Sequence, residues 1–251
     1  MRPVNQRRVV RLLADAGLPA AQIALIGDIP RSTVRGWLAE AKEPKAPSCP
    51  RCGHPPHALD SLPEWDYSYL LGFYLGDGMI SRSRRGVFRL RIVTDSRYPG
   101  IAAECAVAMT AVMPRSRVHV EKLPYNAVEV HAYSKAWPCL FPQHGPGPKH
   151  MRRIRLAKWQ QGIVARRPEQ FIRGLIHSDG CRILNWAHSE RYGRYEYPRY
   201  FFSQVSDDIR RLFCVALQRL GIEYTLPRWN TVSIARADSV RLLDQFVGPK
   251  A

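Results

Sequence analysis

The sequence predicts an α+β protein made of two similar halves in one chain, preceded by a small all-α domain. Two apolar helix-length runs, Tyr69–Ile80 and Phe171–Cys181, each end in Asp-Gly, and each is followed by segments that alternate like strands. Three short helical patterns between residues 4 and 41 predict the all-α domain. The expected parts are residues 1–43, a helical domain; 44–63, a proline-rich linker; 64–150, the first repeat; and 151–251, a bridging segment with the second repeat.

The two apolar runs carry the most informative pattern. Gly72 and Gly76 lie four residues apart, on one face of the first predicted helix, and Gly174 and Ser178 stand 102 residues further along the chain. Each glycine costs roughly 1 kcal/mol against alanine inside a helix, so a compensating interaction is expected. Small residues on one face let a second backbone approach closely, and we therefore expect an interface between the two helices built on these four residues.

Each run ends in an acid, Asp77 in the first and Asp179 in the second. For either copy alone, a buried helix with Asp-Gly turning the chain is a sufficient explanation. Packing of the two small-residue faces, however, brings both carboxylates together at helix C-termini, where they repel each other and the helix dipoles. A divalent cation removes this conflict. Oxygen ligands favour magnesium, and paired metals serve phosphodiester hydrolysis.

At Leu70–Gly78 and Ile172–Gly180 the chain resembles the LAGLIDADG motif of homing endonucleases, in the single-chain branch with two motifs. The resemblance implies two αββαββα halves that form a DNA-binding saddle, with the motif helices at their interface. It also implies that Asp77 and Asp179 bind two or three Mg²⁺ ions, together with the backbone at Gly76 and Ser178. At the first acid of the family pattern this chain carries Leu75 and His177 instead.

A lysine follows Gly-Pro near the end of each half. These are Lys149 and Lys250, at 72 and 71 residues after their acids. In the family that the motifs resemble, a lysine after the last helix of each half points into the active site, where it shields charge on the transition state. The alternative for both residues is an ordinary surface lysine.

The net charge of +17 and the pI of about 10.1 favour a polyanionic partner, and double-stranded DNA is expected. No run is long and apolar enough for a membrane span, so a cytoplasmic protein is predicted. The internal repeat and the resemblance to the two-motif branch predict a monomer with internal pseudo-two-fold symmetry. Candidate DNA-contacting arginines follow each motif. They are Arg82, Arg84, Arg85, Arg89 and Arg91 in the first half, and Arg182, Arg191, Arg194 and Arg199 in the second. A solvated strand face is the alternative.

The N-terminal segment resembles the helix-turn-helix of resolvase-like DNA-binding domains. The apolar positions expected inside are Val9, Leu12, Leu13, Val34, Trp37 and Leu38. On the last helix this leaves an exposed set placed to meet bases or phosphates, namely Arg31, Ser32, Thr33 and Arg35. A small helical bundle with solvated arginines is the alternative.

The linker contains a cluster of potential metal ligands, Cys49, Cys52, His54 and His57. The Cys-x-x-Cys spacing is typical of zinc sites, and the two histidines complete four ligands. Four ligands within nine residues is cramped, since tetrahedral sites usually take their second pair from farther along the chain. A linker with two unpaired thiols therefore stands as the alternative.

Three functions fit these patterns. The first is a metal-dependent, site-specific DNA endonuclease. The second is a non-cleaving transcriptional regulator on the same fold, which an attached helix-turn-helix would suit. The third is an RNA maturase. The retained acid pair favours the endonuclease, because regulators with this fold tend to lose it.

Overall fold

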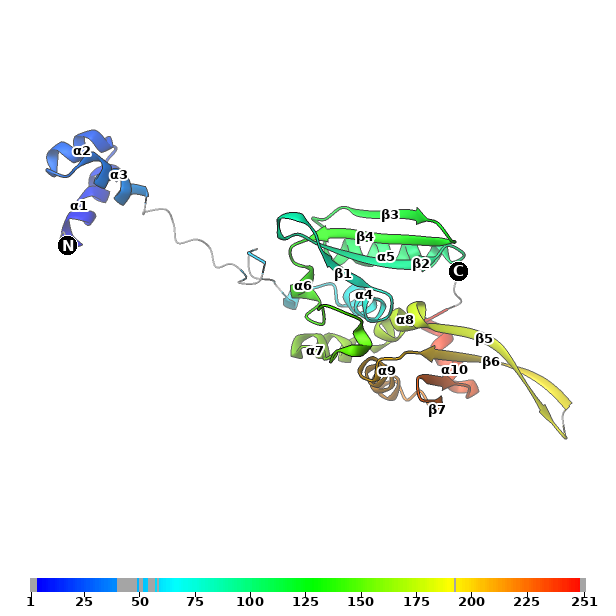
Figure 1. Ribbon diagram of the computed structural model, residues 1–251. Helices are drawn as coiled ribbons and strands as arrows, with labels where there is room; N and C mark the ends of the chain where they lie inside the picture. Colours follow the sequence, from blue (N-terminus) through cyan, green and yellow to red (C-terminus); the bar gives the residue numbers. More distant parts are fainter. Residues whose placement is uncertain are drawn as a thin grey trace. The chain divides into compact units, whose positions relative to one another are not determined.

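The computed structural model describes residues 4–39, 49, 52–53, 57, 59–191 and 193–248 (Figure 1). Its contacts divide the chain into two units, Met1–Pro56 and His57–Ala251. Among the described residues, no helix is both long enough and apolar enough to cross a membrane.

The smaller unit contains three helices, α1 (Val4–Asp15), α2 (Ala20–Ile26) and α3 (Arg31–Ala39). Its core consists of Val10, Ile23, Ile29, Val34 and Trp37. Val34 and Trp37 are buried as predicted, but the stripe on the first helix is wrong, because Val9 and Leu12 are 51% and 60% exposed. Paired apolar residues at positions 9–10 and 12–13 left two possible helix faces, and packing against α2 and α3 selects the one with Val10.

The larger unit repeats one order of elements twice, which confirms the αββαββα halves. The first half runs α4 (Glu64–Gly76), β1 (Met79–Arg82), β2 (Phe88–Asp95), α5 (Pro99–Val112), β3 (Val118–Leu123), β4 (Ala127–Ser134), α6 (Trp137–Leu140). The second runs α8 (Pro168–Asp179), β5 (Gly180–Ser189), β6 (Gly193–Ser203), α9 (Asp207–Arg219), β7 (Thr225–Arg228), β8 (Thr231–Ile234), α10 (Ala237–Phe246). The sheets are antiparallel, with strand orders β1-β2-β4-β3 and β5-β6-β8-β7.

The bridging segment is more structured than the sequence indicated. A short turn, η3 (Lys149–Met151), is followed by the helix α7 (Lys158–Arg166), which buries Gln160 and Ile163. The amide of Gln160 donates to the hydroxyl oxygen of Tyr67 on α4 at 2.7 Å. The basic segment thus ends as a helix packed on the core.

Helices α4 and α8 pack side by side at the centre of the larger unit (Figure 1). A Cβ atom added to Gly72 would lie 2.3 Å from the carbonyl oxygen of Phe171, and one added to Gly174 would lie 2.1 Å from that of Tyr69. Both distances are below any normal contact, so the two backbones touch where the glycines stand. This confirms the predicted helix interface.

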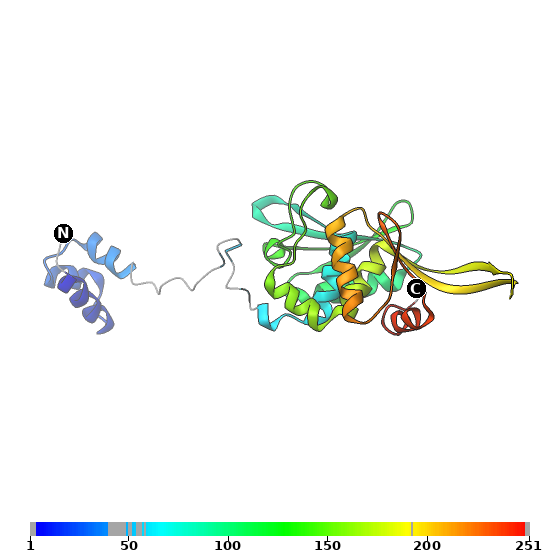
Figure 2. The same ribbon diagram turned by 90° about the horizontal axis from the view of Figure 1, so that it is seen from below.

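The second sheet carries a projecting ribbon that the sequence did not predict. Strands β5 and β6 pair from Gly180 to Ser189, whereas β8 pairs with β6 only over Tyr200–Ser203. The rest forms a two-stranded arm that extends beyond the helices (Figures 1 and 2). Arginines and aromatic residues on both faces of the arm mask the alternation of residues 182–199, so the sequence marks a strand clearly only from Tyr200 onward.

Candidate active site and nucleic-acid interface

The two motif acids lie at adjoining helix ends. Asp77 directly follows α4, is exposed, and donates its backbone N–H to the carbonyl oxygen of Phe73 at 3.1 Å. Asp179 is the last residue of α8 and is half-buried. A Cβ added to Gly76 would lie 2.0 Å from Ser178 Oγ and 2.8 Å from Asp179 Oδ2. The carboxylate of Asp179 therefore lies against the residue that precedes Asp77.

Lys149 reaches these helix ends from the turn η3. Its Nζ donates to the carbonyl oxygen of Gly76 at 2.7 Å and lies 5.0 Å from the ring centroid of Tyr74. Burial lowers the pKa of Lys149 to about 8, although the charges of Asp77 and Asp179 act to raise it. Its predicted counterpart, Lys250, lies outside the residues that the structure describes.

Gln204 is a site residue that the sequence analysis missed. It follows β6, and its Nε2 donates to Asp179 Oδ2 at 2.7 Å, while its Oε1 accepts from the backbone N–H of Ser206 at 3.0 Å. The amide is thereby oriented toward the acid. A lone glutamine after a strand belongs to no motif, so only the fold could reveal it.

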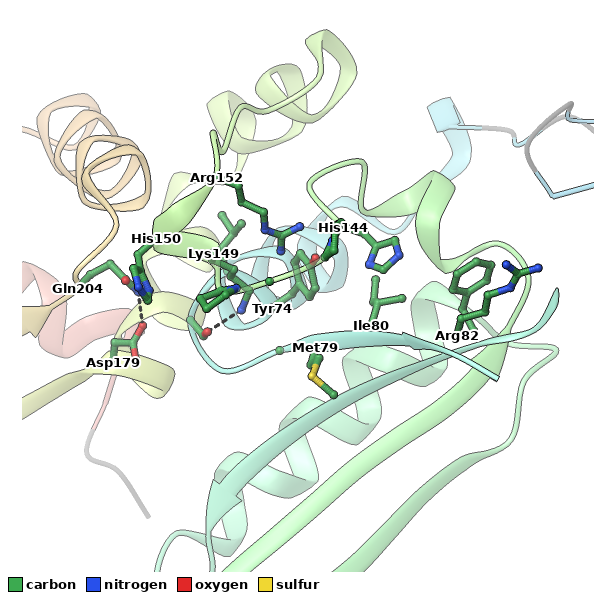
Figure 3. A pocket seen from close by; sticks show the side chains of 18 residues that line it. Tyr74, Met79, Ile80, Arg82, His144, Lys149, His150, Arg152, Asp179 and Gln204 are labelled. Atoms are coloured by element: carbon green, nitrogen blue, oxygen red, sulfur yellow. Dashed lines mark hydrogen bonds between the residues drawn. The ribbon is translucent and has the colours of Figure 1, made fainter. Parts of the chain in front are cut away.

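Lys149, Asp179 and Gln204 line one cavity of about 1100 Å³ (Figure 3). Asp179 and Gln204 stand on one side, and Lys149 comes from the connection between the halves. His144, His150 and Arg152 add further polar groups to the wall. The cavity is thus built from both repeats and from the segment that joins them.

The donor atoms at the helix ends fit hard divalent cations. They are the carboxylates of Asp77 and Asp179 and the carbonyl oxygen of Gly76, and oxygen donors of this kind suit magnesium, manganese and calcium. Ser178 Oγ donates to the carbonyl oxygen of Leu175 at 2.8 Å and packs against Gly76. Its side chain therefore serves the helix contact.

The residues at the family's first-acid positions lie inside the helix interface. His177 is buried, with Nδ1 at 3.0 Å from the hydroxyl of Tyr69 and Nε2 at 3.3 Å from the carbonyl oxygen of Val247. Leu75 is fully buried. Both side chains therefore belong to the packed interior of the larger unit.

The arginines of the first sheet divide into two groups. Arg89 forms an ion pair with the buried Glu129, and Arg91 Nη1 lies 3.5 Å from the same carboxylate. The predicted cationic face therefore contains an acid from β4, which the local sequence did not indicate. The arginines at the β1–β2 connection are exposed, namely Arg82, Arg84 and Arg85.

The arginines of the second sheet lie on both faces of the ribbon. Arg182 is opposite Tyr200 and binds Asp244 of α10 through two hydrogen bonds of 2.7 and 2.9 Å. Arg199 directly precedes Tyr200 on β6, so its side chain points to the face opposite that of Arg182. Its guanidinium donates to Ser233 Oγ at 2.7 Å. The last two, Arg191 and Arg194, are on the exposed arm.

In the smaller unit, the predicted recognition residues stand at the start of α3. Arg31, Ser32 and Arg35 are exposed, whereas Thr33 is half-buried. Arg7 of α1 lies over the ring of Trp37 at 5.3 Å.

The predicted zinc ligands are only partly described. The thiols of Cys49 and Cys52 lie within 4.8 Å of each other, and a backbone bond of 2.8 Å from Gly53 to Cys49 closes the turn between them. In the larger unit, His57 has its ligand atom within 4.8 Å of the Cys139 thiol. His54 is outside the described residues.

Two αββαββα halves joined across small-residue motif helices, with an acid at each helix end, define the class: the larger unit has the fold of the single-chain LAGLIDADG homing endonucleases. The structure of mesophilic variants of the homing endonuclease I-DmoI has a TM-score of 0.50 and 18% identity, over 73% of this chain and 89% of that one. I-DmoI in complex with DNA and Mn gives a TM-score of 0.50 and 18% identity, over 75% and 99%. No protein-family model matches the chain, and no curated protein matches it in sequence. At such identities the likeness shows the fold.

Proposed function

We propose that this protein is a site-specific endonuclease that hydrolyses both strands of double-stranded DNA with divalent metal ions, Mg²⁺ among them. The single observation that carries the proposal is the pair of motif acids beside one buried lysine: Asp179 and Lys149 line one cavity between the repeats, and the charges of both Asp77 and Asp179 act on Lys149. The solved relatives with the same fold include an endonuclease in complex with DNA and Mn. A purely structural helix pair would gain nothing from two carboxylates beside a buried lysine.

In this proposal the metal ions would be held by the two carboxylates and by backbone oxygens at Gly76 and Ser178. When bound, they supply an activated water and charge to steady the leaving oxygen. The chain's own part is to hold the groups in place. Gln204 fixes the carboxylate of Asp179, and the Lys149 ammonium adds positive charge where phosphate charge develops.

The DNA would lie along the sheet faces of both halves, which one protein chain supplies. The unsupported part of the β5–β6 arm spans roughly 20 Å at about 3.3 Å per residue, and an isolated two-stranded ribbon is only marginally stable in water. It exposes Leu184, Trp186 and Tyr195 together with Arg191 and Arg194. Since a two-stranded ribbon fits the major groove, we propose that DNA supports this arm.

The helix-turn-helix favours a second candidate, the non-cleaving regulator. In both cases we propose that Arg31, Ser32, Thr33 and Arg35 contact DNA through α3. The difference lies in chemistry at Asp77 and Asp179, which a regulator does not need.

The test is incubation of the purified full chain with Mg²⁺ and a randomised double-stranded DNA library, followed by sequencing of cut ends. We expect ends that share one extended sequence and that disappear when EDTA replaces Mg²⁺. Selection of a defined site without any cut ends would establish the regulator instead.

A further inference from the structure

Three side chains outside the cavity converge on the first sheet, on the face turned away from α5. They are His119 and Glu121 of β3 and His131 of β4. The strand register sets His119 directly opposite His131. One nitrogen of each histidine and one carboxylate oxygen of Glu121 all lie within 4.8 Å of one another. The two imidazole rings are nearly parallel, with centroids 5.0 Å apart and an angle of 9°.

A fourth residue orients this cluster. His131 Nδ1 lies 2.9 Å from Glu129 Oε1, which favours the tautomer with the proton on Nδ1. The lone pair of Nε2 then points to the other side of the ring, where Glu121 Oε1 lies at 3.9 Å. Carboxylates that hold the far nitrogen of a histidine in this way are typical of metal-ligating histidines.

The neighbouring charges are compatible with a cation. Arg89 and Arg91 are the nearby cationic side chains, and both are engaged by Glu129. Burial, followed by Arg89, lowers the pKa of His131, while Glu129 and Glu121 act to raise it. A lowered pKa favours the neutral imidazole that a metal requires.

We propose that His119, Glu121 and His131 form a binding site for one divalent transition-metal ion of the zinc class. Two imidazoles and a carboxylate are ligands that zinc prefers, whereas magnesium prefers oxygen alone. Ligand distances of about 2.0–2.2 Å require the donor atoms to close by about 1 Å. Rotation of the Glu121 side chain, which is 55% exposed, would bring its carboxylate closer to the two imidazoles.

The site would also change the charge of the sheet face. Glu121 and Glu129 are two carboxylates beside the candidate DNA-contacting residues Arg89 and Arg91. A bound dication offsets both, so occupancy should strengthen DNA binding, an expectation that rests on the proposed function. The metal site itself does not depend on it.

The experiment is zinc titration by isothermal calorimetry of the full chain carrying Cys49→Ser, Cys52→Ser and Cys139→Ser, in excess Mg²⁺. The serines remove the thiols as zinc ligands, and Mg²⁺ fills the carboxylate pair. Three variants are made in this background, His119→Gln, Glu121→Gln and His131→Gln. The matched control is His188→Gln, an exposed histidine on β5.

We expect one zinc per chain in the background protein and in the control, and a Kd raised at least about tenfold in each of the three variants. Unchanged Kd values in His119→Gln and Glu121→Gln would overturn the site. Circular dichroism checks that the buried His131→Gln variant is folded. If it is not, the His119→Gln and Glu121→Gln variants alone decide the result. If the full chain binds zinc as expected but shows no Mg²⁺-dependent cleavage, the result would contradict the proposed function and leave the zinc site standing.

Discussion

Lys149 donates its Nζ hydrogen to the carbonyl oxygen of Gly76 at 2.7 Å, which fixes the ammonium beside the residue that leads into Asp77. The contact joins the connection between the repeats to the end of the first motif helix. The contact also buries the Lys149 ammonium, so the free energy of unfolding should depend on pH.

Lys149→Met should alter how stability changes with pH. The pKa of Lys149 is about 8 in the folded protein and 10.5 ordinarily, so between these values the unfolded chain holds a proton that the folded one lacks. Stability of the metal-free wild type should therefore rise with pH across this window, by up to about 3 kcal/mol from this residue. In urea unfolding with EDTA, the variant should lack that rise. Parallel pH curves for the two proteins would contradict the buried charge.

Gly72→Ala should destabilise the larger unit severely, because its Cβ would meet the Phe171 carbonyl oxygen at 2.3 Å. The loss should reach several kcal/mol, typical of overpacking against backbone. Gly162→Ala is the control: its Cβ would meet only the flexible end of Arg166, at 3.3 Å, so the change should be neutral or stabilise α7 by up to about 1 kcal/mol. Thermal melting compares the two, and equal melting temperatures would refute the close helix contact.

Zinc should accompany protein purified without added metal if Cys49, Cys52, His54 and His57 are ligands, as the Cys-x-x-Cys spacing predicts. Elemental analysis should then show that Cys49→Ser lowers the zinc content by about one ion per chain. Cys139→Ser is a second variant, since this thiol lies within 4.8 Å of the His57 ligand atom. Cys214→Ser, at another half-buried thiol, is the control. Equal zinc content in all four proteins would favour a linker with unpaired thiols.

The smaller unit should be separable from the cutting activity. Leu59 and Leu62 pack against the core of the larger unit, so a truncated protein should begin at His57 and retain them. We expect it to fold and to cleave, with weaker DNA binding and a shallower salt dependence, because α3 and its arginines are gone. Filter binding at several salt concentrations measures this, and unchanged affinity would remove the smaller unit from DNA recognition.

Local and repeated patterns predicted the motif helices, the acid pair and the glycine contact, since each depends on spacing within one motif and on the repeat of that motif 102 residues further along the chain. Features that need distant partners could not be foreseen in the same way. Glu129 meets Arg89 only because β4 pairs with β2, and Gln204 meets Asp179 only once the second sheet forms. The β5–β6 arm was missed because both of its faces are exposed, which removes the alternation of apolar and polar residues that marks a half-buried strand.

The acid pair is the centre of the proposed chemistry, and its test is magnesium-dependent cleavage measured together with melting temperature for Asp77→Asn and Asp179→Asn. Asparagine keeps the shape but removes the charge that a divalent metal needs. The control is Asp238→Asn, whose side chain is 79% exposed on α10. Cleavage should fall by orders of magnitude in both acid variants, with DNA affinity kept and the melting temperature unchanged or raised, because one of two repelling carboxylates is gone. Undiminished cleavage, or a loss of stability of about 1 kcal/mol with DNA chemistry intact, would contradict the assignment of these two acids as the catalytic pair.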